Sequence, residues 1–336
     1  MAGQVWAVNS LGGYYYSLNL SKELRMGVKA TSKFRQFADV KDAFGKVTRA
    51  GQTFTWDTVP MMARGDRSLT ETNTIPQSGH TILQGTLTMN ERGFSVPYTE
   101  VLESLSMLNV RQPIMKVLKY DAMCDLDCLA HAEFNKTPLR VVSTTSADTA
   151  FTITTNSSAT ATNTTLLSKI NVRAVVDGMK SRNIPYYTSD SYYCISRPAA
   201  YRVLKNDIES IHIYTESGLE MIMNGEIGRY EMCRFVEQTV VPTSGATDST
   251  TFDPFSDTGD AWNTAGCGDW AFFFGADTLC EAIHTPEEIR AKIPDDYGRS
   301  KGIAWYALLG YALSHGLGGT AAEATQCRIL KWDSAV

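Results

Sequence analysis

Alternating polar and apolar residues mark two strand-like runs in the first third of the chain. Residues 52–60, QTFTWDTVP, place Phe54 and Trp56 on one face, and residues 85–98, GTLTMNERGFSVPY, repeat the alternation with Gly93 as a candidate bulge. The segment between the runs is polar and rich in turn-forming residues. The pattern predicts a long two-stranded hairpin. Because an isolated hairpin is marginally stable in water, we expect it to lie on its own body or on another subunit.

Apolar residues recur at three- and four-residue steps over 98–134 and predict a long helix. Pro113 interrupts the pattern, which predicts a kink or two segments joined between Val110 and Gln112. At 1.5 Å per residue the uninterrupted element would extend roughly 50 Å. The residues expected on its buried face are Val101, Leu105, Leu108, Met115, Leu118, Ala122, Leu126 and Leu129.

The first 48 residues have the pattern of an arm, with short helical signals at 21–30 and 32–44 that are interrupted by Gly27 and Gly45. Further along, the Ser/Thr-rich segment 143–166 predicts a loop or exposed hairpin that contains the strand FTITT.

The second half of the chain predicts an α+β unit. An amphipathic helix begins near Leu166 and ends at Asn183 and Pro185, and a second helix covers 197–209 with Pro198 in its first turn. Strands are predicted at 138–144, 192–196, 231–242, 269–283 and 324–334.

Composition limits the classes of function. The 336 residues carry 31 Lys plus Arg against 36 Asp plus Glu, a net charge of −5, which disfavours tight non-specific binding of nucleic acid. The most apolar stretch, 302–313, is shorter than the roughly 20 residues that span a bilayer. The seven cysteines are scattered without a CxxC motif, which is typical of reduced, packed thiols. We expect a soluble protein made in the cytoplasm.

The turn Gly225-Glu226-Ile227-Gly228 is the first candidate for chemistry. A Gly-rich turn can hold a phosphate, but no Gly-Lys-Ser/Thr follows here and the next segment has a strand pattern. Glu226 and Glu231 flank the turn, and their charge repels phosphate. We therefore interpret Gly225 and Gly228 as a structural turn.

Cys124, Cys128 and His131 lie at i, i+4 and i+7 and would share one helix face. Such a face can supply three metal ligands, but a fourth ligand is missing nearby and the same face carries core residues. A packed helix is the favoured interpretation, and metal binding is the alternative.

The hairpin connection contains the sequence ARGDR. Its charged residues fit ion pairing between subunits. Such pairs would fix the relative alignment of the subunits more than the strength of their binding. The residues are Arg64, Asp66, Arg67 and the following Glu71. The acidic loop 253–260 lacks the spacing of an EF-hand. No Ser-His-Asp signature, GxSxG or HExxH is present, so the sequence predicts no enzyme and no cofactor.

The order of arm, hairpin, kinked helix and mixed lobe resembles the Hong Kong 97-type major capsid protein of tailed bacteriophages. The sharper similarity is to the podophage branch of the phage N-4 kind. The segments that carry it are 192–210, 225–239, 269–279 and 294–313.

That family has a Gly-x-x-Gly turn followed by an apolar–Arg–aromatic–Val/Ile–Glu strand. Here Gly225 and Gly228 precede Arg-Phe-Val-Glu at 234–237. Two departures mark a distant relative: DDYG at 295–298 lacks the family's proline, and Cys233 replaces a common glycine.

The resemblance implies an α+β capsid fold with an N-terminal arm, an extended loop, a peripheral domain with a long spine helix, and an axial domain. The expected divisions are 1–48 for the arm, 49–97 for the extended loop, 98–145 for the peripheral domain, 146–165 for a Thr/Ser-rich insertion, 166–290 for the axial domain and 291–336 for the return to the peripheral domain.

The implied function is self-assembly into the icosahedral shell around viral double-stranded DNA. Expected partners are the chain itself in hexamers and pentamers, a portal protein, scaffolding or cement proteins, and packaged DNA by proximity only. The alternatives are an encapsulin-type compartment shell and a metal-binding α+β enzyme. The inter-subunit contact candidates are Phe54, Trp56, Arg64, Asp66, Arg67, Glu71, Arg234 and Glu237.

Overall fold

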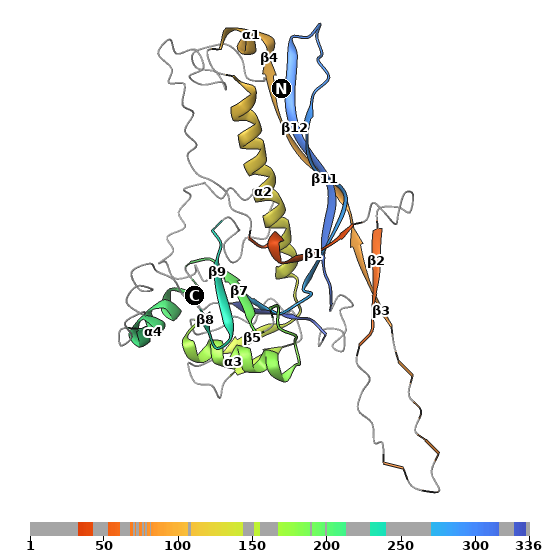
Figure 1. Ribbon diagram of the computed structural model, residues 1–336, viewed down its shortest axis with the longest axis vertical. Coiled ribbons are helices and arrows are strands. Elements are labelled where there is room, and N and C mark those ends of the chain that lie inside the picture. The colour runs from red at the N-terminus through yellow and green to blue at the C-terminus, as the bar shows by residue number, and fades with distance from the viewer. Residues whose placement is uncertain are drawn as a thin grey trace.

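The computed structural model describes an elongated molecule with three parts (Figure 1). A four-stranded sheet runs beside one long helix, a lobe is built on a seven-stranded sheet, and a two-stranded hairpin projects from the side of the four-stranded sheet. The described residues are 33–42, 53–60, 82–106, 109–143, 151–154, 167–188, 190–198, 200–212, 229–239, 270–315 and 326–333, with isolated positions between 68 and 80.

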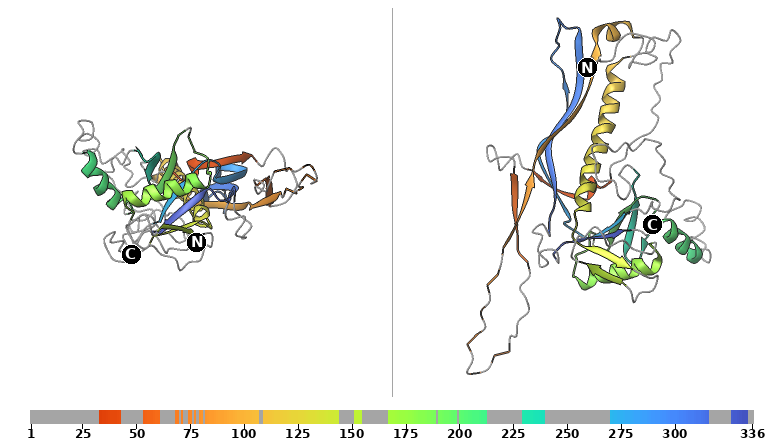
Figure 2. Two further views of the ribbon diagram at one scale, coloured as in Figure 1. Left: turned by 90° about the horizontal axis from the view of Figure 1, so that it is seen from below. Right: turned by 180° about the vertical axis from the view of Figure 1, so that it is seen from behind.

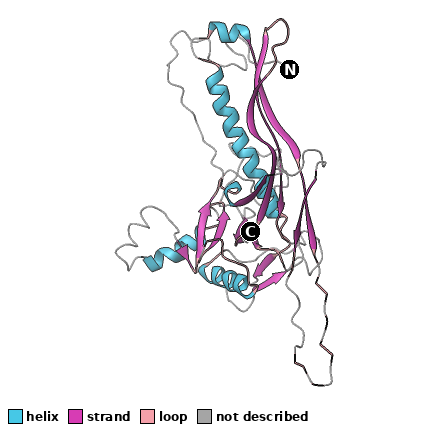
Figure 3. Cartoon of the chain, turned by 45° about the vertical axis from the view of Figure 1, so that its right-hand side comes forward, coloured by secondary structure: helices cyan, strands magenta, loops and turns pink. Residues whose placement is uncertain are grey.

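The four-stranded sheet has the order β1-β11-β12-β4. Its strands are β1 (Ala38–Asp42), β11 (Leu279–Ala291), β12 (Ser300–Leu313) and β4 (Asn90–Thr99). β12 pairs antiparallel with both β11 and β4, and β1 adds a parallel edge strand. Two register shifts in β11 flank Thr285, next to Pro286, whose ring nitrogen cannot donate to the ladder. Figure 3 shows how far these long strands extend along the helix.

Two helices replace the single long element. α1 (Glu100–Leu105) is capped by the Thr99 side chain, and five residues separate it from α2 (Arg111–Asn135). Pro113 is the third residue of α2, where its missing N–H would have had no intrahelical partner. The predicted division near residues 110–112 is confirmed. The 25 residues of α2 correspond to about 38 Å, shorter than the undivided pattern suggested.

The break between the helices also changes which residues are buried. Leu118, Ala122 and Leu126 are buried on α2 as predicted. The prediction is wrong for Val101, Leu105 and Met115, which are exposed. A helical repeat keeps its phase only while the helix is continuous, so the interruption before α2 accounts for Val101 and Leu105. Met115 lies on α2 itself, one position beside the buried i+4 row that begins at Ile114. Leu102 and Ile114 are buried instead, Leu129 is half-buried, and Leu108 lies outside the described residues.

The lobe contains a mixed sheet in the order β6-β5-β13-β10-β7-β9-β8. Its strands are β5 (Arg140–Ser143), β6 (Phe151–Thr154), β7 (Tyr192–Ser196), β8 (Arg229–Tyr230), β9 (Cys233–Glu237), β10 (Trp270–Phe274) and β13 (Ile329–Asp333). The predicted strand positions are confirmed. The run 269–283, however, divides at Gly275 between β10 of this sheet and β11 of the long sheet.

Helix α3 (Lys169–Ser181) ends as the sequence predicts. Asn183 adopts a positive φ of 56°, the Ile184 N–H donates to the Met179 carbonyl, and the Asn183 N–H donates to the Lys180 carbonyl. This is a Schellman motif, in which asparagine tolerates the left-handed conformation. Figure 2 shows α3 at the outer side of the lobe.

Helix α4 (Arg202–His212) begins later than predicted. Pro198 is not in its first turn; the Pro198 carbonyl instead accepts from the Tyr201 N–H in a turn before the helix. The side chain of Tyr201 is buried, and its hydroxyl donates to the Cys194 carbonyl at 3.0 Å. The connection before α4 therefore packs against β7 and forms a hydrogen bond with it.

The hairpin is shorter than the alternating pattern implied. β2 (Thr53–Thr58) pairs antiparallel with β3 (Leu83–Thr88), so the hairpin prediction is confirmed for these strands. Residues 90–99 form the separate strand β4, which pairs with β12. The predicted bulge at Gly93 is wrong, because the β4–β12 register is regular. A Cβ at Gly93 would lie 2.6 Å from the Trp305 carbonyl oxygen, so glycine permits close approach of the two backbones.

The sheets cut across two of the expected domain boundaries. The division at 97/98 falls within β4, and the division at 290/291 falls within β11. β5 and β13, expected in the peripheral domain, belong to the seven-stranded sheet. Sheet membership depends on pairing between strands that are distant in sequence, which local patterns do not reveal.

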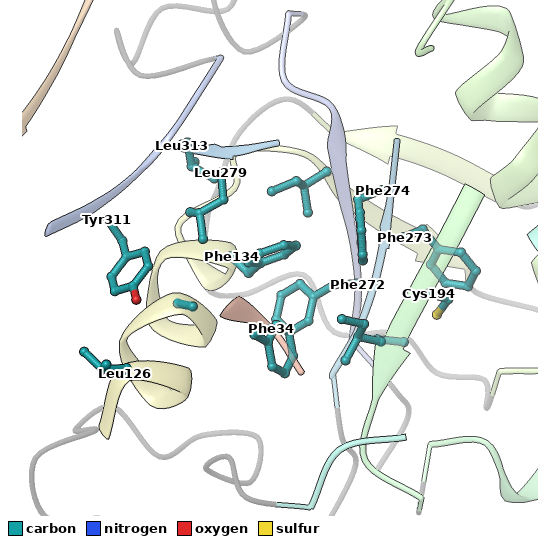
Figure 4. Close-up of a cluster of buried hydrophobic side chains, with 14 of the residues drawn as sticks. Phe34, Leu126, Phe134, Cys194, Phe272, Phe273, Phe274, Leu279, Tyr311 and Leu313 are labelled. Atoms are coloured by element: carbon teal, nitrogen blue, oxygen red, sulfur yellow. The ribbon is translucent and has the colours of Figure 1, made fainter. Parts of the chain in front are cut away.

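One core connects the arm, the spine helix α2 and the lobe. Phe34, Phe134 and Phe272 converge from these three regions (Figure 4), and each is at most 1% exposed. The expected short helix at 32–44 is wrong beyond its first turn: the 3-10 helix η2 (Arg35–Phe37) is followed by β1. Pairing of β1 with β11 stabilises an extended chain there instead.

Candidate intersubunit interface

The base of the hairpin packs on its own chain. Phe54 and Trp56 share one face of β2, as predicted, and both are half-buried against a cluster that includes Leu87 and Met89. The Trp56 indole N–H donates to the Ser314 carbonyl at 3.1 Å. Of the two supports expected for the hairpin, its own body is therefore the one that its base contacts. Contact of Phe54 and Trp56 with a neighbouring subunit remains a prediction.

The charged part of the hairpin lies mostly outside the described residues. Arg64, Asp66 and Arg67 are in this category, and Glu71 is described and exposed. The other described positions between 68 and 80 are exposed as well. These four residues stay candidates for contacts between subunits.

Arg234 and Glu237 on β9 both contact their own chain. The Arg234 guanidinium lies 6.0 Å from the centre of the Tyr193 ring, and Glu237 pairs with Lys205 at 2.5 Å. Phe235 between them packs edge-on against the buried ring of Tyr201. The turn residues Gly225 and Gly228 lie outside the described residues.

The Cys124, Cys128 and His131 face points into packed surroundings. Cys128 and His131 are buried, and the His131 ring stacks on Trp270 and meets Phe34 and Phe272 edge-on. Burial lowers the pKa of His131 to about 3, so the imidazole is neutral. Among the described residues, no group of three His, Cys, Asp or Glu side chains is placed to hold a metal. Nor does any helix within the described ranges have the length and apolar character needed to cross a membrane.

The arm segment, residues 33–42, is a site that the sequence did not reveal. Asp127 on α2 is completely buried, and its Oδ1 accepts the backbone N–H groups of Lys33 and Arg35 at 3.0 and 3.1 Å. Its Oδ2 accepts from the side-chain amide of Gln238, next to β9. One carboxylate therefore joins the arm segment, the spine helix and the lobe.

The Arg35 side chain joins the arm segment to the long sheet. Its Nε donates to Glu281 Oε1 at 3.0 Å, and its terminal nitrogens donate to both carboxylate oxygens of Glu287 at 2.8 and 3.1 Å. The Tyr311 hydroxyl also donates to Glu281 at 2.9 Å. Burial raises the pKa of Glu281, and the positive charge of Arg35 partly opposes that rise. At Glu287 the hydrogen bond from Arg35 lowers the pKa of the carboxyl group. Glu281 lies in the otherwise apolar stretch 279–283, the one sequence signal that could have indicated a buried charge there.

Exposed large apolar side chains gather at two ends of the molecule. Four of the thirteen among the described residues belong to the hairpin and its connection, and one, Tyr187, belongs to the lobe. The other eight lie on α1, the first turns of α2, β4, the outer part of β11 and the connection from β11 to β12, here called the distal end (Figure 1). The distal-end residues are Phe94, Val101, Leu105, Met115, Val117, Ile289, Ile293 and Tyr297.

The strand connection at the distal end presents its aromatic residue outward. Asp296 and Tyr297 both adopt positive φ, 51° and 55°, in the turn between β11 and β12. Such conformations are unfavourable for residues with a side chain, and bulky residues rarely adopt them. The turn leaves Tyr297 fully exposed and Ile293 nearly so. Exposed apolar groups of this kind are typical of surfaces that contact another protein.

Several solved structures with this architecture are bacteriophage capsids. The capsid of Helicobacter pylori bacteriophage KHP30 matches with a TM-score of 0.67 at 11% identity, over 98% of this chain and 97% of that chain. The capsid of cyanophage P-SCSP1u gives 0.66 at 10% identity, over 95% and 93%. The capsid of Ralstonia phage GP4 gives 0.62 at 12% identity, over 98% and 98%. This chain has a phage capsid fold.

The likeness confirms the α+β, Hong Kong 97-type capsid fold that the sequence predicts. The match covers nearly the whole of both chains, so it includes the hairpin, the long sheet and the lobe. No protein-family model and no curated protein sequence matches the chain. Assignment to the podophage branch of the phage N-4 kind therefore stays a prediction. In this capsid fold the hairpin and the distal end are the candidate surfaces for contacts between subunits.

Proposed function

We propose that the chain is the major capsid protein of a tailed bacteriophage. Copies would assemble as hexamers and pentamers into an icosahedral shell that encloses double-stranded DNA. The protein would be made in the host cytoplasm and would reside in the virion. Its role would be structural rather than enzymatic, without a cofactor.

The segregation of exposed apolar side chains carries this proposal. Twelve of the thirteen large ones among the described residues belong to the hairpin region or the distal end. A subunit with contact surfaces at separate ends joins more than one neighbour. A shell engages many such contacts at once, so that individually modest interactions give a stable assembly. The capsid fold of the chain supports the same function.

Two alternatives share part of these features. An encapsulin-type compartment would use the same fold for cargo rather than for a genome, and neighbouring terminase and portal genes would favour the virus. A metal-binding α+β enzyme would need Cys124, Cys128 and His131 as ligands. The His131 ring is instead buried and packs against the rings of Trp270, Phe34 and Phe272.

Further partners follow from the proposed role. A portal protein would replace one pentamer, and scaffolding or cement proteins would assist assembly. Packaged DNA would lie near the inner wall, and the net charge of −5 fits a wall to which DNA does not adhere.

Electron microscopy of the expressed protein tests the proposal directly. We expect closed shells, or rings and sheets of capsomers, in negative stain, and a fast-sedimenting species in a sucrose gradient. A chain that stays monomeric at high concentration and catalyses turnover of a metabolite would contradict it.

A further inference from the structure

The arm segment contacts three parts of the molecule through residues that are far from it in sequence. Phe34 packs edge-on against His131 and Phe134 of α2 and against Phe272 of β10, with ring centres 5.2 to 6.0 Å apart (Figure 4). Phe37 packs against rings of the lobe, including Phe274 at 5.0 Å. The two aromatic side chains, at the two ends of one 3-10 turn, thus pack on different sets of rings.

Two buried carboxylates lie beside these apolar positions. Asp127 is 0% exposed and Glu281 is 1% exposed. A buried carboxylate is costly unless it receives hydrogen bonds from donors, preferably charged ones. The arm segment supplies backbone N–H groups to Asp127 and the Arg35 guanidinium to Glu281. The surface is therefore complementary to a segment that carries an aromatic residue followed by an arginine, here in a 3-10 turn.

The contacts continue along the segment in both directions. The Lys33 ammonium donates to the Glu237 carbonyl on β9, and β1 pairs in parallel register with the first residues of β11. The segment thus joins the lobe, the spine helix and the long sheet.

We propose that Asp127, Glu281 and the aromatic pocket around Phe34 form a peptide-binding site, and that residues 33–42 occupy it as a ligand. Occupancy fixes the lobe against the spine helix and the long sheet. The site recognises a Phe-Arg pair with a preceding lysine, and in this structure the chain's own arm provides it. The inference concerns the contacts within one subunit and does not depend on the function proposed above.

The test separates the arm from the body after folding. A cleavage site for a specific protease is inserted between Asp42 and Thr53 of the full chain, and the purified, unassembled protein is cut. We expect the arm fragment to remain bound through gel filtration and to be seen with the body in native mass spectrometry. With Arg35→Ala, Phe34→Ala or Asp127→Asn, it should dissociate at least about tenfold faster, since each change removes a buried aromatic or a charge-assisted contact.

Matched variants control for general effects. Arg111→Ala removes a surface arginine–carboxylate pair, and Asp177→Asn changes an exposed acid on α3; neither should change release of the arm. After release, hydrogen exchange should rise in the second half of α2, in β9 and at the start of β11. Adding a synthetic peptide of residues 30–44 should reverse that rise.

Three results would overturn the proposal. The first is immediate loss of the unmodified arm fragment. The second is retention of the arm by the Arg35→Ala and Asp127→Asn proteins for as long as by the unmodified protein. The third is hydrogen exchange that rises uniformly over the whole body when the arm is released. The last would mean that the arm belongs to the folding core rather than binding to a formed site.

Discussion

Arg35 Nε lies 3.0 Å from Glu281 Oε1, although the two residues are 246 positions apart in the sequence. Glu281 is buried and Arg35 is partly exposed, so the pair closes the arm segment onto the long sheet at a site with little water. Removal of one partner from a buried pair leaves an uncompensated charge, which is more costly than the absence of both.

The first prediction follows from that asymmetry. Arg35→Ala should lower the free energy of unfolding by about 3 kcal/mol, because Glu281 loses its guanidinium partner. The double variant Arg35→Met/Glu281→Met should recover most of that loss, since no buried charge remains. Urea denaturation followed by circular dichroism measures both. Additive losses in the double variant would show that the two side chains do not interact.

A second prediction concerns the crossing of the hairpin over β12. A Cβ at Gly310 would lie 2.4 Å from the Thr88 carbonyl oxygen and 2.6 Å from Leu87 Cδ2, so Gly310→Ala must displace the base of the hairpin. We expect a folded chain with reduced shell yield in negative stain. Gly79→Ala is the matched control, because a Cβ there meets nothing within 4 Å. Equal shell yields for the two variants would contradict a role of hairpin position in assembly.

The third prediction removes the hairpin connection. Deletion of residues 61–80 should leave a folded subunit that fails to assemble, because the strands β2 and β3 and their contacts with the body are retained. Circular dichroism reports the fold, and sedimentation reports assembly. Normal shells from the deleted chain would disprove the assignment of this segment as an extended loop that contacts neighbours.

The distal end gives a fourth prediction. Ile293→Ser together with Tyr297→Ser should reduce shell formation while stability changes by less than about 0.5 kcal/mol, since both side chains are exposed. Lys180→Ser, an exposed change on α3 of the lobe, serves as the control. Assembly is measured by light scattering and microscopy. If the double variant assembles like the control, the distal end is not a contact surface.

The fifth prediction uses the pKa of His131, which burial lowers to about 3. Below pH 6.5 the unfolded chain binds a proton at this residue and the folded chain does not. The contribution of neutral His131 to the free energy of unfolding is therefore fully present above pH 6.5. It is lost as the pH falls toward 3, by about 1.4 kcal/mol per pH unit. His131→Phe should reduce the loss between pH 7 and pH 5 by about 2 kcal/mol. Denaturation at both pH values measures this, with exposed His80→Phe as a control that should retain the full loss.

The sequence predicted the local elements where the pattern depends on neighbours in the chain. Pro113 indicated the division of the spine helix, Asn183 and Pro185 indicated the end of α3, and alternation indicated Phe54 and Trp56 on one face. These features follow from backbone conformation and from periodicity within one element. The resemblance of the carboxyl half to capsid proteins added the fold, which the solved structures bear out.

Only the tertiary structure decided how distant segments combine. It separated 90–99 from the hairpin, divided 269–283 between two sheets, and placed Phe34 of the arm in the core. It also joined Asp127 and Glu281 to one arm segment, which none of their sequence neighbours indicates. Strand pairing and burial of charge depend on the free energy of long-range contacts, and a local pattern of polar and apolar residues does not specify which distant segment supplies the partner.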